Sequence, residues 1–333
     1  MKEYTGKIDV SKDTMLFVLN DILNNNIKET TTKENILKMV PEIYEKTEEK
    51  ELIKLLPYAS YQALEDLIEY VKKSNNIEEF DNKYFDLKKY GAVHYLYEMM
   101  IMVMKVKGNE RTYYVNGDVL EKLKKLFTDE NRKIAERYGK IENLTMGMLY
   151  SYGVVDIEVV RKQLSIYMKE IISEKELDEL YYERLNLNLD IKRIKINWKN
   201  TKVKQNFITY LEPEIVDIDE IIQEQEYRKF QYKIFKEKDI LSRKEILWTP
   251  AAQRLYNYLK NTGVIGGEYM FEKIMKNNEI GRDVLSILME ICEFETSEET
   301  VKFISLFQEW YNNYPQYILG GYTPMEMAKG MIK

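Results

Sequence analysis

The 333-residue sequence has a single cysteine, Cys292, and a single histidine, His94. One cysteine excludes an intramolecular disulfide bond, and a chain without disulfides fits a reducing compartment such as the cytoplasm. These two residues also exclude a zinc site with two imidazole ligands and a cysteine-based zinc cluster. A nucleophilic site of the Ser-His-Asp or Cys-His type would have to use His94. Its neighbours between Tyr90 and Tyr97 are mostly apolar or aromatic, which is typical of a structural histidine.

Long apolar runs are absent as well. The longest, Met99–Met104, has six residues, whereas a membrane-spanning helix needs roughly 20. The N-terminal residues lack the apolar core of a signal peptide. We therefore expect a cytoplasmic protein without a membrane-spanning segment.

Glycine and proline are scarce, with 14 and 6 residues respectively. Both residues favour tight turns, so their scarcity, together with abundant Lys, Glu, Leu and Ile, favours a mainly α-helical chain. Hydrophobic residues make up 44% of the sequence and charged residues 32%. This balance is ordinary for a globular protein and argues against disorder.

Motifs of catalysis and cofactor binding are also missing. The sequence has no glycine–lysine phosphate-binding loop and no G-x-G-x-x-G after an expected strand. The acidic run Asp217–Glu220 could be taken for a metal cluster, but acids are favoured at a helix start, and this explains the run better. No carboxylate pair stands out among the 56 acidic residues. We therefore expect a non-catalytic protein without a metal or another cofactor.

Helical spacing of apolar residues, turn signals and capping motifs predict a mainly α fold with four domains. We expect helical bundles around one winged-helix-like domain. The short module that precedes this domain in the chain is expected to be a shortened second version of it. Whether residues 1–127 share a core with the rest stays open from the sequence. The expected domains are an N-terminal helical domain at 1–78, a short helix–strand–helix module at 79–127, a winged-helix-like domain at 128–216 and a C-terminal helical domain at 217–333.

The prediction of a winged-helix-like domain depends on residues 128–216, where the spacing of apolar residues changes from the period of a helix to that of a strand. Asp156 is an expected N-cap, and Ser173 with Glu176 forms a capping box. From Ile191 the apolar and polar residues alternate, which is the period of a strand. Three helices followed by a β-hairpin is the order of a winged helix-turn-helix. The expected helices span residues 129–152, 157–169 and 173–185, and the expected strands span 191–198 and 203–210.

The C-terminal domain carries its own local signals. Thr249 and Thr323 each precede a proline, which places an N-cap before a proline in the first helical turn. Glu326 completes a capping box with Thr323. Two apolar stripes at helical spacing are expected to pack inward: Leu285, Leu288, Met289 and Cys292 form one, and Phe303, Leu306, Phe307 and Trp310 form the other.

The charge layout points to a candidate nucleic-acid site on the expected hairpin. Residues 191–211 carry six cations and no acid. Such a hairpin can neutralise several phosphates, and its affinity for nucleic acid would then fall steeply with salt. Trp198 near the hairpin tip adds a ring that can stack on an exposed base. The candidate nucleic-acid-binding residues are Lys192, Arg193, Lys195, Trp198, Lys199, Lys202 and Lys204.

Other features favour a second interpretation. Residues 212–226 carry seven acids and no base, and the whole chain has a net charge of −6. The acidic segment could simply pair with the basic hairpin. The expected helix 173–185 is also acidic, which is unfavourable in a major groove. A nucleic-acid contact would therefore depend on the wing and be largely sequence-independent.

The alternative is a protein-binding adaptor or inhibitor, encoded by a mobile element, that acts through charged helical surfaces. The partner is thus either a nucleic acid, bound through residues 191–210, or another protein, and no membrane partner is expected. Aromatic C-terminal helices are compatible with a homodimer, but the sequence does not determine the oligomeric state.

Two segments carry a resemblance. Met148-Leu-Tyr-Ser-Tyr-Gly-Val-Val155 and the region Tyr311–Glu326, which ends in Gly-Gly-Tyr-Thr-Pro-Met-Glu, resemble a group of Firmicutes, phage and plasmid proteins with several helical and winged-helix-like modules. In some of them a similar ending adjoins a cysteine-rich zinc tail, which this sequence lacks. The resemblance covers about a quarter of the chain. It implies a multi-module helical protein from a low-GC bacterium or one of its phages or plasmids, and it carries over no catalytic residue.

Overall fold

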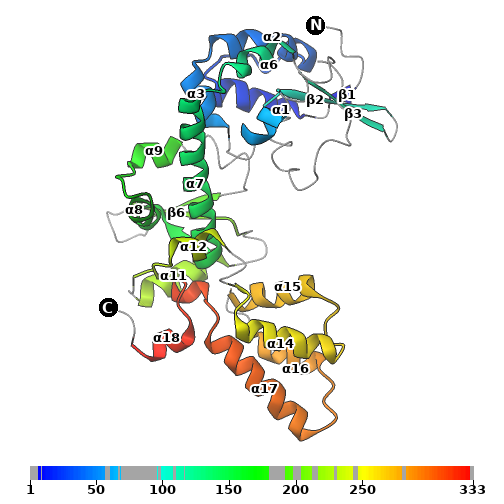
Figure 1. The fold of residues 1–333 in the computed structure, drawn as a ribbon, viewed down its shortest axis with the longest axis vertical. Coiled ribbons are helices and arrows are strands. Elements are labelled where there is room, and N and C mark those ends of the chain that lie inside the picture. Colours follow the sequence, from blue (N-terminus) through cyan, green and yellow to red (C-terminus); the bar gives the residue numbers. More distant parts are fainter. Residues whose placement is uncertain are drawn as a thin grey trace. The chain divides into compact units, whose positions relative to one another are not determined.

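A computed structural model shows a mainly helical protein, as the sequence predicts (Figure 1). The chain divides into two compact units. Unit 1 comprises Met1–Lys140 and Asp178–Leu189, and unit 2 comprises Ile141–Leu177 and Asp190–Lys333. The four-domain division stays a prediction. The structure describes residues 7–8, 10–56, 61–66, 68, 96, 99–107, 110–115, 117–179, 192–197, 204–211, 217–228, 231–242, 247–279 and 283–330. His94 lies outside these residues.

The described part of unit 1 has a large helical core, a smaller cluster of Ile53, Tyr61 and Ala135, and a three-stranded antiparallel sheet of order β1-β2-β3. Buried side chains from the expected 1–78 and 79–127 segments share this core. The hydroxyl of Tyr44, for example, donates to the carbonyl oxygen of Met99 at 2.7 Å. The elements are β1 (Lys7–Ile8), α1 (Lys12–Leu16), the π-helix η1 (Phe17–Ile22), α2 (Lys33–Lys46), α3 (Glu49–Leu55), β2 (Met102–Lys107), β3 (Glu110–Val115) and α6 (Gly117–Lys124).

One strand of this sheet corrects the sequence analysis. The module at 79–127 was expected to contain one strand, but this region has two, β2 (Met102–Lys107) and β3 (Glu110–Val115). β2 pairs with β3 along its whole length, from Met102 opposite Val115 to Lys107 opposite Glu110. Pairing with β3 gives its backbone the hydrogen bonds that a strand requires.

Unit 2 begins within α7 (Asp129–Tyr152), which contributes residues to both units. The predicted helix at 129–152 is confirmed, and so is the N-cap at Asp156, whose carboxylate accepts from the backbone N–H of Glu158 at 2.7 Å. Ser173 caps the next helix by accepting from the backbone N–H of Glu176 at 3.1 Å. The following elements are β4 (Val154–Asp156), α8 (Ile157–Met168), α9 (Glu174–Glu179), β5 (Lys192–Asn197) and β6 (Lys204–Thr209).

The sheet of unit 2 is antiparallel with the order β4-β6-β5. Val155 of β4 and Arg193 of β5 both lie opposite Ile208 of β6. β4 is a further difference from the sequence analysis, which expected no strand between the helices at 129–152 and 157–169. Gly153 precedes this strand. This glycine has a φ of +71°, and a Cβ built on it would lie 2.4 Å from the ring of Tyr317. The turn therefore requires glycine both for its backbone conformation and for space.

The C-terminal part of the chain completes the core around this sheet. Phe207 of β6 and Val154 of β4 pack with Ile221, Ile222 and Tyr317. The helices of this part are α11 (Ile218–Arg228), α12 (Glu237–Leu241), α14 (Pro250–Asn261), α15 (Glu268–Glu279), α16 (Val284–Ile291), α17 (Ser297–Asn312), the 3-10 helix η5 (Tyr317–Leu319) and α18 (Pro324–Ala328).

A buried glutamine links the two parts of unit 2. The side-chain nitrogen of Gln225 in α11 donates to the carbonyl oxygens of Tyr152, Val154 and Tyr317 at 3.2, 3.3 and 2.7 Å. Its oxygen accepts from the hydroxyl of Tyr232 at 2.7 Å. This one side chain joins the end of α7, the start of β4 and η5 by hydrogen bonds.

The C-terminal capping motifs are confirmed. Thr249 accepts from the backbone N–H of Ala252, with Pro250 in the first turn of α14. Thr323 and Glu326 form a reciprocal capping box at the start of α18. Phe303, Phe307 and Trp310 are buried as expected, whereas the other expected stripe is only partly buried, because Met289 is 38% exposed.

Candidate nucleic-acid interface

The β5–β6 hairpin positions the candidate basic residues. Both strands agree with the predicted alternating segments to within a residue at each end. Four candidates, Lys192, Arg193, Lys195 and Lys204, lie in the paired ladder. The remaining three, Trp198, Lys199 and Lys202, lie outside the described residues.

The register sorts these positions onto the two faces of the sheet, because directly opposed residues of paired strands share a face. Positions 193, 195 and 204 lie opposite Ile208, Asn206 and Asn197, and all six are on one face. Position 192 lies opposite Thr209 and belongs to the other face. Three of the four described basic positions are therefore on one face of the hairpin.

The end of the hairpin distant from its turn is anchored in the protein. Phe207, on the face of position 192, packs in the core with Ile221 and Tyr317. Ile208, on the basic face, is fully buried, and α8 contacts both β4 and β6. Asn206, nearer to the turn, is only half-buried. The basic positions 195 and 204 thus follow the ladder away from the core toward the turn.

The connection between α8 and α9 is held by local hydrogen bonds. The hydroxyl of Ser165 accepts from the backbone N–H of Ile172 at 3.1 Å, and Arg161 donates to the carbonyl oxygen of Ile172 at 3.4 Å. Arg161 also binds Glu158 at 2.7 Å, and this hydrogen bond lowers the pKa of the Glu158 carboxyl. Ile171 in this connection is 89% exposed.

The acidic character of α9 sets it apart from the hairpin. Within α9, Glu174, Glu176, Asp178 and Glu179 oppose a single cation, Lys175. Phosphates would be repelled by such a helix. The basic residues of this part of the sequence are therefore concentrated in the hairpin segment and not in α9.

A metal site and a reactive thiol are two further kinds of functional site. Among the residues that the structure describes, no group of three or more His, Cys, Asp or Glu side chains is placed to hold a metal ion. Cys292 is buried, and burial raises the pKa of its thiol, which disfavours the reactive thiolate. No helix within the described ranges is both long and apolar enough to cross a bilayer.

Comparison with known proteins finds no match to a family model, to a curated protein or to a solved structure.

Proposed function

We propose that residues 129–209 form a winged-helix module and that the chain is a non-catalytic, regulatory nucleic-acid-binding protein. The order of elements supports this proposal: helix, short strand, two helices and a two-stranded hairpin, with the short strand β4 paired to the second hairpin strand β6. In a winged helix the hairpin is the wing that lies against the phosphate backbone.

The observation that carries the proposal is the set of basic positions on one face of the wing. Arg193, Lys195 and Lys204 share that face by register. No acid occurs between residues 191 and 211 to neutralise them. Phosphate contacts of this kind fix a protein on nucleic acid without reading its sequence.

The acidic helix α9 limits the mode of binding. In many helix-turn-helix proteins the second helix of the motif enters the major groove, but α9 carries four acids. We infer a contact made mainly by the wing, with weak sequence preference. Its affinity should depend strongly on salt, because each phosphate contact releases counterions.

The same acidic helix favours the alternative function, a protein-binding adaptor or inhibitor. An acidic helix that is followed in the chain by a basic hairpin suits electrostatically steered docking on another protein. The two functions differ in one observable: only the nucleic-acid binder associates with DNA or RNA at low salt.

The test is fluorescence anisotropy with labelled duplex DNA, single-stranded DNA and RNA over a salt series. The wing variant carries Arg193→Glu, Lys195→Glu and Lys204→Glu. The matched control carries Lys28→Glu, Lys38→Glu and Lys125→Glu, three exposed lysines of unit 1. We expect micromolar binding by the wild type and the control.

In the wing variant, the slope of log affinity against log salt should become shallower by about 3, one for each lost phosphate contact. No binding by the wild type at low salt would reject the nucleic-acid function in favour of the adaptor. Equal losses in the wing variant and the control would show that the wing is not the contact surface.

A further inference from the structure

Helix α16 in unit 2 is apolar on most sides, yet one face of it is exposed. Its sequence, Val284-Leu-Ser-Ile-Leu-Met-Glu-Ile291, contains one charged residue. Val284 and Leu288 are buried, whereas Ile287 is 42% and Ile291 is 54% exposed. These two isoleucines lie four residues apart and therefore share a face. A helix that is apolar on most sides is normally covered on most sides.

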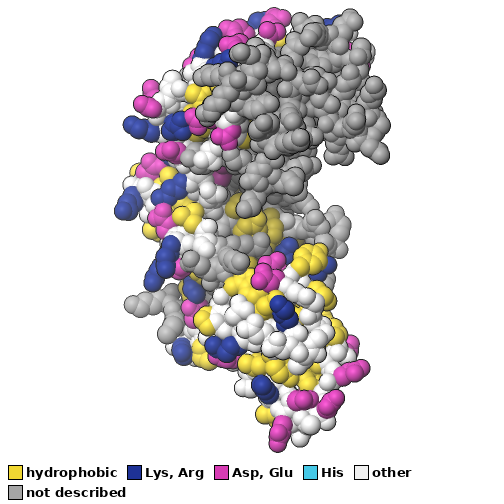
Figure 2. All heavy atoms as spheres, turned by 45° about the vertical axis from the view of Figure 1, so that its right-hand side comes forward, with side chains coloured by type: hydrophobic (Ala, Val, Ile, Leu, Met, Phe, Trp, Pro, Cys, Tyr) yellow, Lys and Arg dark blue, Asp and Glu magenta, His cyan; other side chains and the backbone are white. Residues whose placement is uncertain are grey.

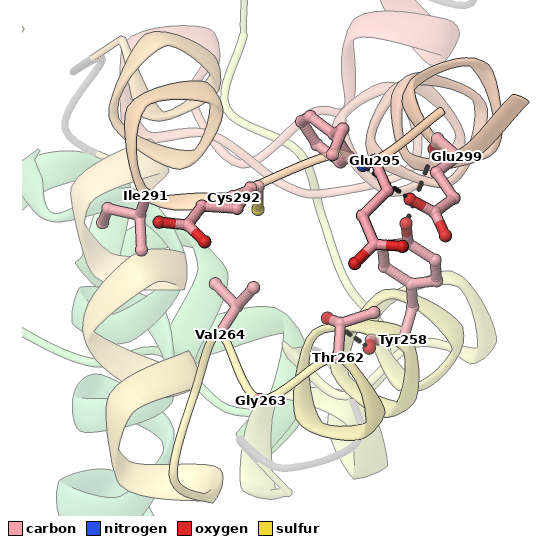
Figure 3. Close-up of a pocket in the computed structure, with 10 residues that line it drawn as sticks. Tyr258, Thr262, Gly263, Val264, Ile291, Cys292, Glu295 and Glu299 are labelled. Atoms are coloured by element: carbon pink, nitrogen blue, oxygen red, sulfur yellow. Dashed lines mark hydrogen bonds between the residues drawn. The ribbon is translucent and has the colours of Figure 1, made fainter. Parts of the chain in front are cut away.

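A pocket of about 520 Å³ adjoins this face (Figure 3). Figure 3 shows Ile291 and Val264 on one side of the pocket, and Glu295, Glu299 and Tyr258 on the other. Glu293 and the ring of Phe294 line it as well. The pocket thus combines apolar walls with three carboxylates and continues from the exposed Ile291.

The segment that lines much of the pocket is rich in acids, and one base lies nearby, since Nζ of Lys302 is 5.7 Å from the centroid of the Tyr258 ring. Residues 283–301 carry six acids and no base. In Figure 2 acidic side chains gather at the lower end of the view, where α17 begins. Glu299 accepts from the backbone N–H of Glu295 at 3.0 Å. Among the described residues, none of the three pocket carboxylates forms an ion pair with a lysine or arginine.

We propose that the exposed face of α16 and the adjoining pocket form one docking surface for a basic, partly apolar segment of a partner protein. A lysine or arginine side chain has an aliphatic stem and a charged end. The stem matches the apolar walls of Val264 and Ile291, and the charged end matches Glu293, Glu295 and Glu299. The same acids repel nucleic acid and anionic lipid, so this surface is distinct from the proposed wing contact, and neither proposal requires the other.

The test uses a fluorescein-labelled amphipathic peptide with leucine and lysine at helical spacing, and a second peptide with glutamate in place of each lysine. Two variants of the full chain address the two parts of the surface. The charge variant carries Glu293→Gln, Glu295→Gln and Glu299→Gln, which keeps the hydrogen-bonding oxygens. The apolar variant carries Ile287→Ser and Ile291→Ser.

Each variant has a matched control. Glu34→Gln, Glu268→Gln and Glu272→Gln remove three exposed acids elsewhere, and Ile166→Ser and Ile171→Ser remove two exposed isoleucines elsewhere. We expect the lysine peptide to bind the wild type and both controls within twofold of each other. Binding should weaken about tenfold in the charge variant and in the apolar variant, since both parts of the surface contact the peptide.

Three outcomes would overturn the proposal. One is no binding of the lysine peptide, and another is equal binding of the glutamate peptide. The third is self-association of the wild type, measured by analytical ultracentrifugation, that the apolar variant abolishes, because a second copy of the chain would then cover α16. Circular dichroism confirms that each variant folds, and a variant that does not fold is replaced by Ile291→Thr alone.

Discussion

The two three-stranded sheets of this protein share a hairpin but differ in how the third strand joins it. In unit 1, β1 pairs with β2, the first strand of its hairpin, and in unit 2, β4 pairs with β6, the second strand. Their charges differ as well. Lys107 lies opposite Glu110 at the turn of the β2–β3 hairpin, whereas Lys195 and Lys204 lie opposite asparagines.

This difference shows that the basic character of β5–β6 is not a requirement of a hairpin. Opposite charges across a ladder stabilise a sheet and like charges destabilise it. Residues 102–115 include three bases and one acid, whereas residues 191–211 include six bases and no acid. The second hairpin therefore carries an excess of positive charge within its own segment, and the proposed binding function depends on this excess.

The largest expected effect comes from the turn that lets β4 join its sheet. Gly153→Ala adds a Cβ at a φ of +71° and forces it against Tyr317. Strain and overpacking together should lower the free energy of unfolding by roughly 3 kcal/mol. Gly263→Ala is the control, since Gly263 has a φ of +76° but open space around its Cβ, and it should cost about 1 kcal/mol. Urea unfolding measures both, and equal losses would contradict the role of Tyr317.

A smaller effect is expected from the glutamine that links the sheet of unit 2 to the C-terminal part. Gln225→Leu leaves the buried carbonyl oxygens of Tyr152 and Val154 without this donor. The free energy of unfolding should fall by about 2 kcal/mol. Gln223→Leu, at an exposed position of the same helix, is the control. Unchanged stability in Gln225→Leu would mean that these hydrogen bonds contribute little to holding the sheet.

Binding of duplex DNA tests directly whether the two hairpins differ in function. Changing Lys105, Lys107 and Arg111 of β2–β3 to Glu reverses as many charges as the wing variant does. We expect the wing variant to bind duplex DNA at least about tenfold more weakly than the wild type, or about 1.4 kcal/mol, and the β2–β3 variant to bind within twofold of it. Anisotropy at a single low salt concentration suffices, and equal losses would remove the distinction between the two hairpins.

The smallest expected effect is a pH dependence at the C-terminal capping box, for which unit 1 has no described counterpart. Burial by itself raises the pKa of Glu326, but hydrogen bonds from Lys233 at 2.7 and 2.9 Å and from Thr323 lower it below its ordinary value. A lowered carboxyl pKa means stabilisation above the pKa of the unfolded chain that is lost as the pH falls through the folded pKa.

Glu326→Gln should therefore cost about 1 kcal/mol at pH 7 and almost nothing near pH 3. Thermal unfolding of both proteins at the two pH values measures the difference. Glu309→Gln, at the exposed ion pair with Arg254, is a control for acid effects on surface charge. A difference between wild type and Glu326→Gln that is the same at both pH values would contradict the titration of this carboxyl.

The sequence predicts several elements between residues 129 and 209 because their signals are local. The N-cap at Asp156 and the alternation after Ile191 need no information from distant residues. β4 and β2 were not predicted. β4 has only three residues and β2 is rich in methionine, so neither has a clear local strand pattern, and each is a strand because it pairs with a neighbouring strand. The positions of Gln225 and Tyr317 against the sheet could not be foreseen either, because they depend on tertiary packing.

The candidate sites show the same limit. The basic residues of the wing follow from composition, and the register then determines which of them share a face. The docking surface on α16 was not predicted. The helical spacing of apolar residues in α16 predicted a buried stripe that includes Met289. Periodicity alone cannot show how much of an apolar helix is covered by the rest of the chain.

The contact between Tyr317 and the sheet also has a consequence for biosynthesis. The hydroxyls of Tyr210 and Tyr317 lie 2.6 Å apart although 107 residues separate them in sequence. During synthesis at about 5–20 residues per second, the ribosome therefore needs roughly 5–20 s after completing β6 to add Tyr317. Ile221 and Ile222 follow β6 closely and can cover Phe207 early, but the core of this sheet lacks Tyr317 for that interval, so we expect it to reach its full packing only near the end of translation.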